Sequence, residues 1–383
     1  MIYLKKIILL IICILLIPIS VNAETPDLTK SSKSALIMEY TTGEIVYEKN
    51  IHEKLAPASM TKMMSLLVIM EYIENGGMKE TDMIKVSQNA SSMGGSQIFL
   101  NTDEVMSVQD LLKGVAIASA NDAVVALAER VAGTEDAFIN MMNKKVKELN
   151  LKNTNFKNVH GLDEPNHYSS AYDMAMIAKE LINHENILEY SSIYECYLRK
   201  GTENEIWLVN TNKLVRFYNG SDGLKTGYTK NAGHCLTSTA KKNDMRLITV
   251  VMNNTSSENR NKETMDMLDY GFNQYSVETF IKKGSTIEIL KISKGVEKHI
   301  EIVPMSDVTV LNKLGKKKEN VNYELILDDI VLPIKNGDII GKLQLKDGNT
   351  VLREINLTTK NDVNKIGFFQ LFLRNLSEIF LGM

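Results

Sequence analysis

Two strand-forming regions, separated by a long helical region, constrain the fold of this chain more than any other feature. Residues 34–50, SALIMEYTTGEIVYEKN, contain two β-rich runs that flank residues 41–43, a pattern typical of a β-hairpin. Strand patterns return at residues 233–240, GHCLTSTA, and 245–254, MRLITVVMNN. We expect these distant strands to pair in one antiparallel sheet with helices packed on it, which is an α+β fold.

The region between the two strand groups has helical periodicity over residues 59–183. Within it, residues 63–72 form a strongly apolar run that predicts a buried helix, and glycines follow this run. Residues 107–133 have apolar side chains at helical spacing, with a polar break at Ser119-Ala120-Asn121. A last helix is predicted at residues 258–275, where it closes the unit.

After this unit the sequence changes to short alternating strands separated by Gly, Lys and Asp turns, which predicts a small all-β domain. Its expected strands are residues 285–292, 299–304, 307–314, 323–327, 331–335, 338–345 and 351–357. A separate amphipathic segment follows. The predicted division of the chain is therefore 1–23, 24–275, 276–360 and 361–383.

The N-terminal segment has the pattern of a secretory signal peptide. Lys5 and Lys6 precede an apolar core that begins at Ile7, and small residues lead to Ala23, the expected last residue before cleavage. Cleavage changes the formal charge from −3 to −5, because two lysines and no acids are lost. An uncleaved anchor helix is the alternative, although the apolar run is short for a full membrane span.

Composition excludes some classes of function. Hydrophobic residues make up 44% and charged residues 24% of the chain, as in ordinary globular proteins. The net charge of −3 and the lack of a basic domain argue against a nucleic-acid partner. Cys196 and Cys235 remain after cleavage of the signal peptide, and two cysteines in a large exported chain do not form a disulfide framework, so we expect free thiols.

Three short motifs stand in an order that carries chemical information. Ser59-x-x-Lys62 opens the buried helix, and at this spacing the two side chains share a helix face. Ser119-x-Asn121 interrupts an apolar helical region, and Lys225-Thr226-Gly227 is predicted to begin a strand after a turn. Each motif alone is weak, because Ser238-x-x-Lys241 also matches the first pattern.

These motifs, in this order, resemble the active site of the serine penicillin-binding proteins and serine β-lactamases. The flanking segments narrow the resemblance to the D-alanyl-D-alanine carboxypeptidases of low molecular mass: APASMTKMM, ASANDA, FKNVHGLDEPNHYSSAYDMA and DGLKTGYTKNAGHCL. The resemblance covers nearly all of the mature chain, including the β-rich domain and the amphipathic tail. It implies a penicillin-binding protein-like α+β fold with a helical subdomain.

The chemistry of the first motif can also be argued from the residues. A serine hydroxyl is a poor nucleophile until a base removes its proton. Lys62 can act as that base if its amine is neutral, and we expect burial, the positive helix end and the second cation Lys225 to lower its pKa. Ser59 is then the nucleophile. The alternative is that Ser59 caps the helix and Lys62 extends into solvent.

The remaining roles follow from the resemblance together with simple chemistry. Ser119 is expected to relay protons to the leaving amine, and Asn121 to hydrogen-bond the substrate amide. Lys225 and Thr226 suit a carboxylate, and Gly227 leaves room for the substrate backbone. The backbone N–H groups of Ser59 and Tyr228 form the expected oxyanion hole. Arg260 is a candidate for a further carboxylate contact, with a solvated helix arginine as the alternative. No metal or cofactor is expected.

The sequence therefore predicts a serine-type D-alanyl-D-alanine carboxypeptidase that removes the terminal D-alanine from peptidoglycan stem peptides and binds β-lactams covalently. A transpeptidase and a β-lactamase remain alternatives within the fold, and a catalytically silent wall-binding protein is the alternative outside it. A class A β-lactamase would need a Glu-x-x-Leu-Asn run between the second and third motifs, and the nearest segment, residues 180–183, is one residue short. The expected location is the outer face of the cytoplasmic membrane.

The tail, residues 361–383, is predicted to bind the membrane surface as an amphipathic helix that lies in the interface plane. Its charges nearly cancel, so apolar burial should dominate and binding should resist salt. Packing on the β-domain or a dimer contact are the alternatives. One broad face carries the apolar residues Ile366, Phe368, Phe369, Phe372, Leu373, Leu376, Ile379 and Phe380.

Overall fold

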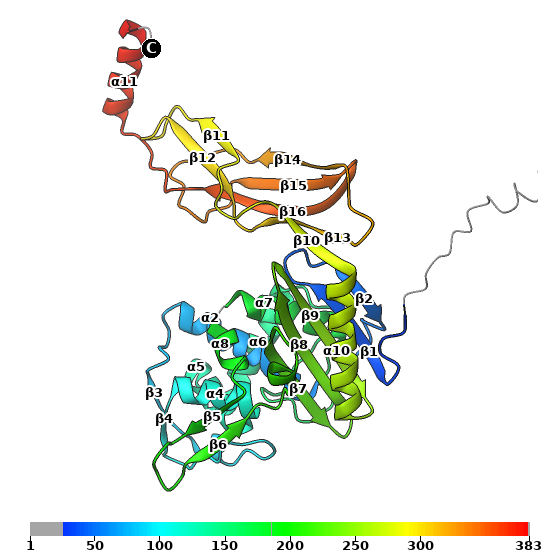
Figure 1. Ribbon diagram of the computed structural model, residues 1–383. Coiled ribbons are helices and arrows are strands. Elements are labelled where there is room, and N and C mark those ends of the chain that lie inside the picture. Colours follow the sequence, from blue (N-terminus) through cyan, green and yellow to red (C-terminus); the bar gives the residue numbers. More distant parts are fainter. Residues whose placement is uncertain (1–25, 185, 382–383) are drawn as a thin grey trace, which may run out of the picture.

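The structure, a computed structural model, describes residues 26–184 and 186–381 (Figure 1). A sheet with helices on both faces forms the first unit, an all-β unit follows, and a single helix ends the described chain. The predicted signal peptide, residues 1–23, lies outside the described residues. No helix within the described residues combines the length and apolar character that crossing a bilayer requires.

The central sheet is antiparallel and joins strands from the two ends of the first unit. Its order is β2-β1-β9-β8-β7, so the N-terminal hairpin pairs with the late strands through β1 and β9, where Leu36 faces Val250. The predicted sheet of sequence-distant strands is thus confirmed. Its strands are β1 (Ser32–Glu39), β2 (Ile45–Lys49), β7 (Ser221–Thr229), β8 (Gly233–Lys242) and β9 (Met245–Asn254).

Both faces of this sheet are covered, which explains why its middle strands are apolar at successive positions rather than at alternate ones. In β1, Leu36 and Met38 belong to the core shared with the helical region, whereas Ala35 and Ile37 belong to the core beneath α10 (Ser257–Gln274). The strands are therefore fixed from two sides, and the edge strand β7 remains beside the helical region (Figure 1).

The helical region contains the predicted helices and two short strand pairs that the sequence analysis did not predict. One pair joins β3 (Met83–Lys85) to β4 (Val105–Ser107), and the other joins β5 (Glu195–Leu198) to β6 (Ile206–Val209). The helical elements are η1 (Ala58–Thr61), α2 (Lys62–Glu74), α3 (Gln88–Ser91), α4 (Val108–Ala118), α5 (Asn121–Ala132), α6 (Glu135–Glu148), α7 (Ala171–Asn183), α8 (Asn186–Ser191) and α9 (Leu214–Phe217).

The second unit is all-β, as predicted, but the expected strands include one error and omit the strand β10. Residues 331–335 form no strand: only Ile334 makes an isolated bridge, to Val363, and Pro333 has no N–H to donate to a ladder. The sheets are β10-β13 and β11-β12-β16-β15-β14. Their strands are β10 (Tyr275–Ile281), β11 (Glu288–Lys291), β12 (His299–Pro304), β13 (Val308–Lys313), β14 (Val321–Leu327), β15 (Gly341–Asp347) and β16 (Thr350–Thr359).

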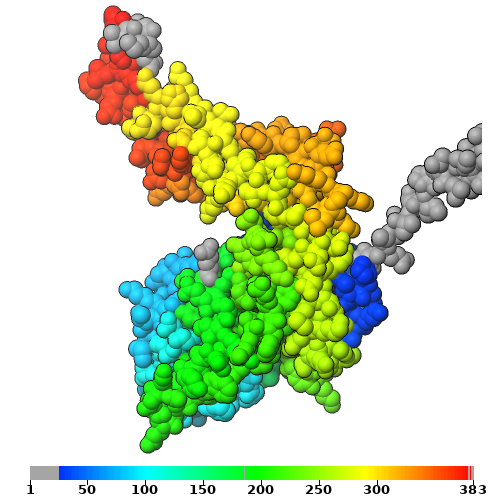
Figure 2. Space-filling view, in the orientation of Figure 1, coloured from blue at the N-terminus to red at the C-terminus, as the bar shows by residue number. Residues whose placement is uncertain are grey.

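The final helix, α11 (Phe368–Leu381), protrudes from the end of the all-β unit that is remote from the first unit (Figure 2). Its large apolar side chains are exposed: Phe368 is 86% and Phe369 70% accessible to solvent. The predicted helix therefore exists, and its apolar face is not packed on the β-unit.

Candidate active site

Ser59 lies in a single 3-10 turn, η1, that leads directly into α2. The turn is tightly constrained, because Ala58 has a positive φ of 48° although it is not a glycine. The N-cap residue of α2 is Thr61, and no side chain caps this helix. The alternative in which Ser59 serves as a helix cap is therefore wrong.

The Lys62 side chain is fully buried and points toward Ser59 rather than solvent. Its Nζ lies 3.1 Å from Ser59 Oγ, 2.6 Å from Asn121 Oδ1 and 2.8 Å from the carbonyl oxygen of His160. These three contacts contradict the alternative in which Lys62 extends into solvent. They also bring the first two sequence motifs into direct contact.

The environment of Lys62 favours a neutral amine. Burial holds the pKa of Lys62 well below its usual value, the charge of Lys225 lowers it further, and Asp122 acts in the opposite direction. A neutral amine has two N–H groups and one lone pair. Two of the neighbours of Nζ are carbonyl oxygens that can only accept, so the lone pair is left for the Ser59 hydroxyl. This is the arrangement of a general base beside its nucleophile.

Ser119 and Asn121 stand at a sharp break between α4 and α5. Ser119 ends α4 with a positive φ of 63°, Asn121 begins α5, and both side chains are buried. The Asn121 amide links two parts of the site, because its Oδ1 accepts from Lys62 while its Nδ2 donates to the carbonyl oxygen of Gly94 at 2.6 Å. The polar break in the helical pattern therefore delivers Asn121 to the lysine amine.

Lys225 and Thr226 lie buried on β7, the edge strand of the central sheet. They do not begin the strand, as the sequence suggested, because β7 starts at Ser221 and Lys225 pairs with Thr237 of β8. The Lys225 Nζ donates to the carbonyl oxygen of Thr226 at 3.1 Å, and Thr226 Oγ1 donates to Thr211 Oγ1 at 2.8 Å. The third motif is thus fixed by the sheet rather than by a turn.

Arg260 of α10 provides a second buried cation beside Lys225. Its side chain donates to neutral oxygens, Asn261 Oδ1 at 2.9 Å and the carbonyl oxygen of Cys235 at 3.5 Å. Burial, and secondly the charge of Arg260, lower the pKa of Lys225 to about 7. Arg260 is only 6% exposed, so the solvated-arginine alternative is wrong. Two buried cations with neutral partners form a place where an anion would be stabilised.

Gly227 is required by the turn that carries Ser59. A Cβ atom at position 227 would lie 2.9 Å from the carbonyl oxygen of Pro57, 3.0 Å from the Ala58 Cβ and 3.1 Å from the Ser59 nitrogen. The sequence analysis attributed this glycine to room for the substrate. The structure gives a different reason, because the protein's own nucleophile turn already packs against Gly227.

Tyr228 and Ser238 lie where neither side chain reaches the Lys62 amine. The Tyr228 ring is 62% exposed and stacks on His234, with ring centroids 4.5 Å apart. Ser238, from the second Ser-x-x-Lys match, is fully buried within β8 and donates to the carbonyl oxygen of Gly223 at 2.9 Å. Tyr228 can therefore contribute through its backbone, and Ser238 is held inside the sheet.

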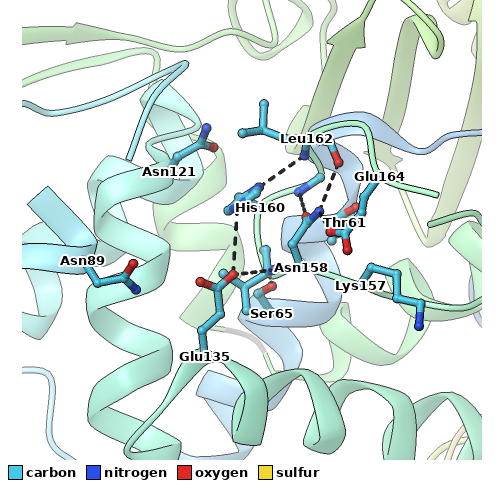
Figure 3. Close-up of polar contacts among 12 residues, drawn as sticks. Thr61, Ser65, Asn89, Asn121, Glu135, Lys157, Asn158, His160, Leu162 and Glu164 are labelled. Carbon is cyan, nitrogen blue, oxygen red and sulfur yellow. Dashed lines mark hydrogen bonds and ion pairs between the residues drawn. The ribbon is translucent and has the colours of Figure 1, made fainter. Parts of the chain in front are cut away.

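A loop that includes residues 158–167 contacts the Lys62 amine through the His160 carbonyl oxygen, and Figure 3 shows its polar contacts. Asn158 braces the loop, since its Oδ1 accepts from the Gly161 N–H and its Nδ2 donates to the Leu162 carbonyl oxygen. His160 Nδ1 accepts from the Leu162 N–H, and burial lowers the pKa of His160 to about 4, so the ring is neutral. His160 thus contributes its backbone oxygen, to Lys62, rather than an acid or a base.

Sequence reasoning missed two residues that hold this arrangement in place. The Lys157 N–H donates to His167 Nδ1 at 3.0 Å, so the His167 Nε2–H donates to Thr61 Oγ1 at 2.8 Å, next to Lys62. Asp122 is fully buried, and its carboxylate accepts backbone N–H groups of residues 98 and 100. An acid directly after Asn121 in an apolar helix was the one available signal for Asp122.

One group of side chains elsewhere has metal-ligand chemistry. Ligand atoms of Glu71, Glu180 and His184 lie within 4.8 Å of one another. However, the Lys145 ammonium already lies 2.8 Å from Glu71, and His184 Nδ1 lies 2.8 Å from Glu74. We therefore assign no metal to this group. Cys196 and Cys235 are free thiols, as expected.

Comparisons with known proteins identify the family. Residues 20–256 match the family described as D-alanyl-D-alanine carboxypeptidase, and residues 275–365 match the penicillin-binding protein 5 C-terminal domain. The chain is 46% identical over 355 residues to the D-alanyl-D-alanine carboxypeptidase DacF of Bacillus subtilis, covering 92% of this chain and 91% of that protein. The chain belongs to the D-alanyl-D-alanine carboxypeptidase family.

Solved structures agree with this assignment. This carboxypeptidase resembles penicillin-binding protein 5 from Haemophilus influenzae with a TM-score of 0.71 and 32% identity, over 89% of this chain and 99% of that chain. It also resembles penicillin-binding protein D2 from Listeria monocytogenes in its cefotaxime-bound form, with a TM-score of 0.59 and 29% identity, over 65% and 100% of the two chains.

These findings confirm the predicted family, the α+β fold class and the enzyme class, which is that of a serine-type D-alanyl-D-alanine carboxypeptidase. They do not favour the transpeptidase or β-lactamase alternatives. The roles of individual side chains, the location of the protein and its contact with a membrane stay predictions. Arg260 lies beyond the residues that match the carboxypeptidase family.

Proposed function

We propose that this carboxypeptidase acts through Ser59 on the peptide bond between the two terminal D-alanines of a peptidoglycan stem peptide. The observation that carries the proposal is the 3.1 Å approach of Ser59 Oγ to the buried Lys62 amine. The Ser59 proton passes to Lys62 Nζ as the new C–O bond forms. The C–N bond then breaks, the departing amine takes a proton through Ser119, and water hydrolyses the acyl-enzyme.

Backbone N–H groups stabilise the negative oxygen of the tetrahedral intermediate in this proposal. The Ser59 N–H lies against the strand that carries Tyr228, because Gly227 allows the turn and β7 to approach closely. Two donors fixed in this way need little reorganisation during the reaction. The geometry that requires Gly227 is therefore also the geometry that assembles the proposed oxyanion hole.

Intact-mass measurement tests the proposed activity directly. After mixing with penicillin, we expect one persistent adduct per chain, together with release of D-alanine from a peptide that ends in D-Ala-D-Ala. An adduct that disappears within the assay would favour a β-lactamase. A chain that gains no mass and releases no D-alanine would contradict the enzyme mechanism and favour a silent wall-binding protein.

The carboxylate of the substrate is proposed to bind between Lys225, Thr226 and Arg260. A C-terminal carboxylate would supply the anion that these two buried cations lack, and the Thr226 hydroxyl would turn from Thr211 Oγ1 to donate to it. Charge-assisted hydrogen bonds in a buried site are stronger than neutral ones, so this contact can orient the scissile bond. The lowered pKa of Lys225 makes the contact dependent on pH.

Lys225→Ala is expected to reduce kcat/KM for a peptide with a free C-terminal carboxylate far more than for the same peptide with an amidated C-terminus. In the unchanged protein, Lys225 is protonated below its pKa of about 7, so recognition of the free acid should weaken as the pH rises through about 7. The amidated peptide should lack this dependence. Equal losses for the two peptides would contradict the carboxylate role.

The second part of the proposal concerns location. The signal-peptide pattern of residues 1–23 and a substrate in the cell wall both support export to the outer face of the cytoplasmic membrane. There α11 would lie in the membrane interface with its phenylalanine face in the acyl boundary. The exposure of Phe368, Phe369, Phe372 and Phe380 supports this placement, because a helix packed on the β-unit would cover them.

Removal of α11 is expected to release the protein from membranes without loss of activity on small peptides. Because Val363 is buried in the core of the β-unit and pairs with Ile334, the shortened chain should end at Gly367. We expect the mature chain to sediment with neutral lipid vesicles and the shortened chain to stay in the supernatant. A mature chain that also stays in the supernatant would contradict the anchor.

A further inference from the structure

The base of α11 is fixed to one turn of the β-unit. The Val296 N–H donates to the Asn364 carbonyl oxygen at 2.9 Å, and the Ile366 N–H donates to the Lys294 carbonyl oxygen at 2.9 Å. The Arg374 guanidinium, in the second turn of the helix, donates to the carbonyl oxygen of Gly295 at 3.0 Å. Segments that are distant in the sequence thus hold the helix and this turn together.

Three lysines meet at this junction, and we name them the basic cluster: Lys291, Lys294 and Lys365. They line one cavity of about 560 Å³ whose other lining residues are apolar or serine, and no acid lines it. All three side chains are exposed, and within the described residues none of the three ammonium groups forms an ion pair with a carboxylate. Their charges are therefore available to an external anion.

The basic cluster lies at the base of α11, and the apolar face of this helix is exposed. Arg374 directs the polar side of the helix at the turn, while Phe369 and Phe372 on the helix remain 70% and 52% exposed. Val331 in the wall of the same cavity is 76% exposed. With the phenylalanine face of α11 in the acyl boundary, lysines at the base of the helix would lie at the level of the lipid headgroups.

We propose that the basic cluster binds the phosphate groups of anionic phospholipids and so orients the β-unit on the membrane. The proposal rests on the anchoring role proposed for α11. The formal net charge, −3 for the full chain and −5 after the predicted cleavage, predicts repulsion from an anionic surface. Charges beyond about 8 Å are screened at physiological ionic strength, however, so the nearby lysines decide the interaction. Counting only the tail charges, as the sequence analysis did, predicts binding that is indifferent to salt.

The test compares two kinds of vesicle at low and high salt. We expect the mature chain to bind phosphatidylcholine vesicles that contain phosphatidylglycerol on the order of 100-fold more tightly than pure phosphatidylcholine vesicles, since each of the three lysines contributes about 1 kcal/mol near an anionic surface. High salt should remove this gain and leave neutral binding unchanged. Replacement of the basic cluster should also remove the extra affinity for anionic vesicles and leave binding to neutral vesicles unchanged. The substitutions are Lys291→Gln, Lys294→Gln and Lys365→Gln.

A charge-matched control separates local from overall charge. Three exposed lysines of the first unit are replaced together: Lys30→Gln, Lys152→Gln and Lys241→Gln. This control should keep the full gain on anionic vesicles. The proposal would be overturned if the control lost the extra affinity for anionic vesicles, or if the variant without the basic cluster kept it.

The outcomes also distinguish this proposal from the anchor on which it depends. If the mature chain binds both kinds of vesicle equally, the anchor stands and the role of the basic cluster fails. If it binds neither, the anchor fails, and the basic cluster fails with it. The chain that ends at Gly367 retains all three lysines without the helix, so its binding to anionic vesicles should be weak and fully abolished by salt.

Discussion

Ser59→Ala is expected to abolish both release of D-alanine and covalent labelling by penicillin. The variant loses the hydroxyl that lies 3.1 Å from the Lys62 amine, and within the described residues that amine has no other serine partner. Ser59 is half-buried and makes one long hydrogen bond, so the thermal stability of the variant should change little. Intact mass, D-alanine release and thermal unfolding are the measurements.

The matched control for this variant is Ser238→Ala, in the other Ser-x-x-Lys sequence. Ser238 is fully buried in β8, where its hydroxyl donates to the Gly223 carbonyl oxygen at 2.9 Å. Its loss should destabilise the sheet by about 1 kcal/mol and leave penicillin labelling intact. Labelling that persists in Ser59→Ala and disappears in Ser238→Ala would reverse the assignment of the nucleophile.

The three motifs could be found in the sequence because local signals mark each of them. Ser59 and Lys62 precede an apolar helix, and a polar Ser119-Ala120-Asn121 inside an apolar region requires an explanation. The pairing of the two strand groups was predictable for a related reason, since β-rich runs stand at both ends of a helical region and a two-stranded hairpin alone is only marginally stable. Patterns of this kind depend only on residues that are neighbours along the chain, so they can be read from the sequence.

Contacts between distant segments explain what the sequence could not reveal. A glycine is required at position 227 because Pro57 and Ser59, which lie far from it in the chain, pack closely against its backbone. The His167 contact with Thr61 crosses a similar separation. Neither Gly227 nor His167 belongs to a periodic sequence pattern, so these contacts can be seen only in the folded structure. The same holds for the basic cluster, where two segments that are distant in the sequence supply the lysines.

The error at residues 331–335 has a different cause. The segment VLPIK is as apolar as a true strand, and the strand prediction rested on this apolar character. Within a sheet, however, Pro333 would leave one position of the ladder without a donor. Ile334 is buried in the core of the β-unit all the same, so its apolar side chain contributes to the core although its segment forms no strand.

Lys62→Ala is expected to give a folded protein whose acylation by penicillin is at least about 100-fold slower, the usual scale for loss of a general base. The variant removes the amine that faces Ser59 and leaves Asn121 and the His160 carbonyl oxygen without their donor. The rate of adduct formation measures the effect. A rate within a few-fold of the unchanged protein would show that another group removes the Ser59 proton.

Lys62→Met separates the catalytic role of this lysine from its structural cost. Because the folded-state pKa of Lys62 lies well below its unfolded value, the unfolded chain binds more protons between the two, and stability from this group rises with pH across that window. Methionine has no charge to desolvate but leaves the Asn121 and His160 oxygens without their donor, so the diagnostic quantity is the pH slope of stability rather than stability at one pH. The Lys62→Met variant should gain less stability than the unchanged protein as the pH rises, whereas Lys152→Met, at an exposed position, should keep the slope of the unchanged protein. A Lys62→Met variant whose stability rises with pH as steeply as that of the unchanged protein would contradict a lowered pKa of Lys62, and the argument for a neutral base held ready by burial would fail.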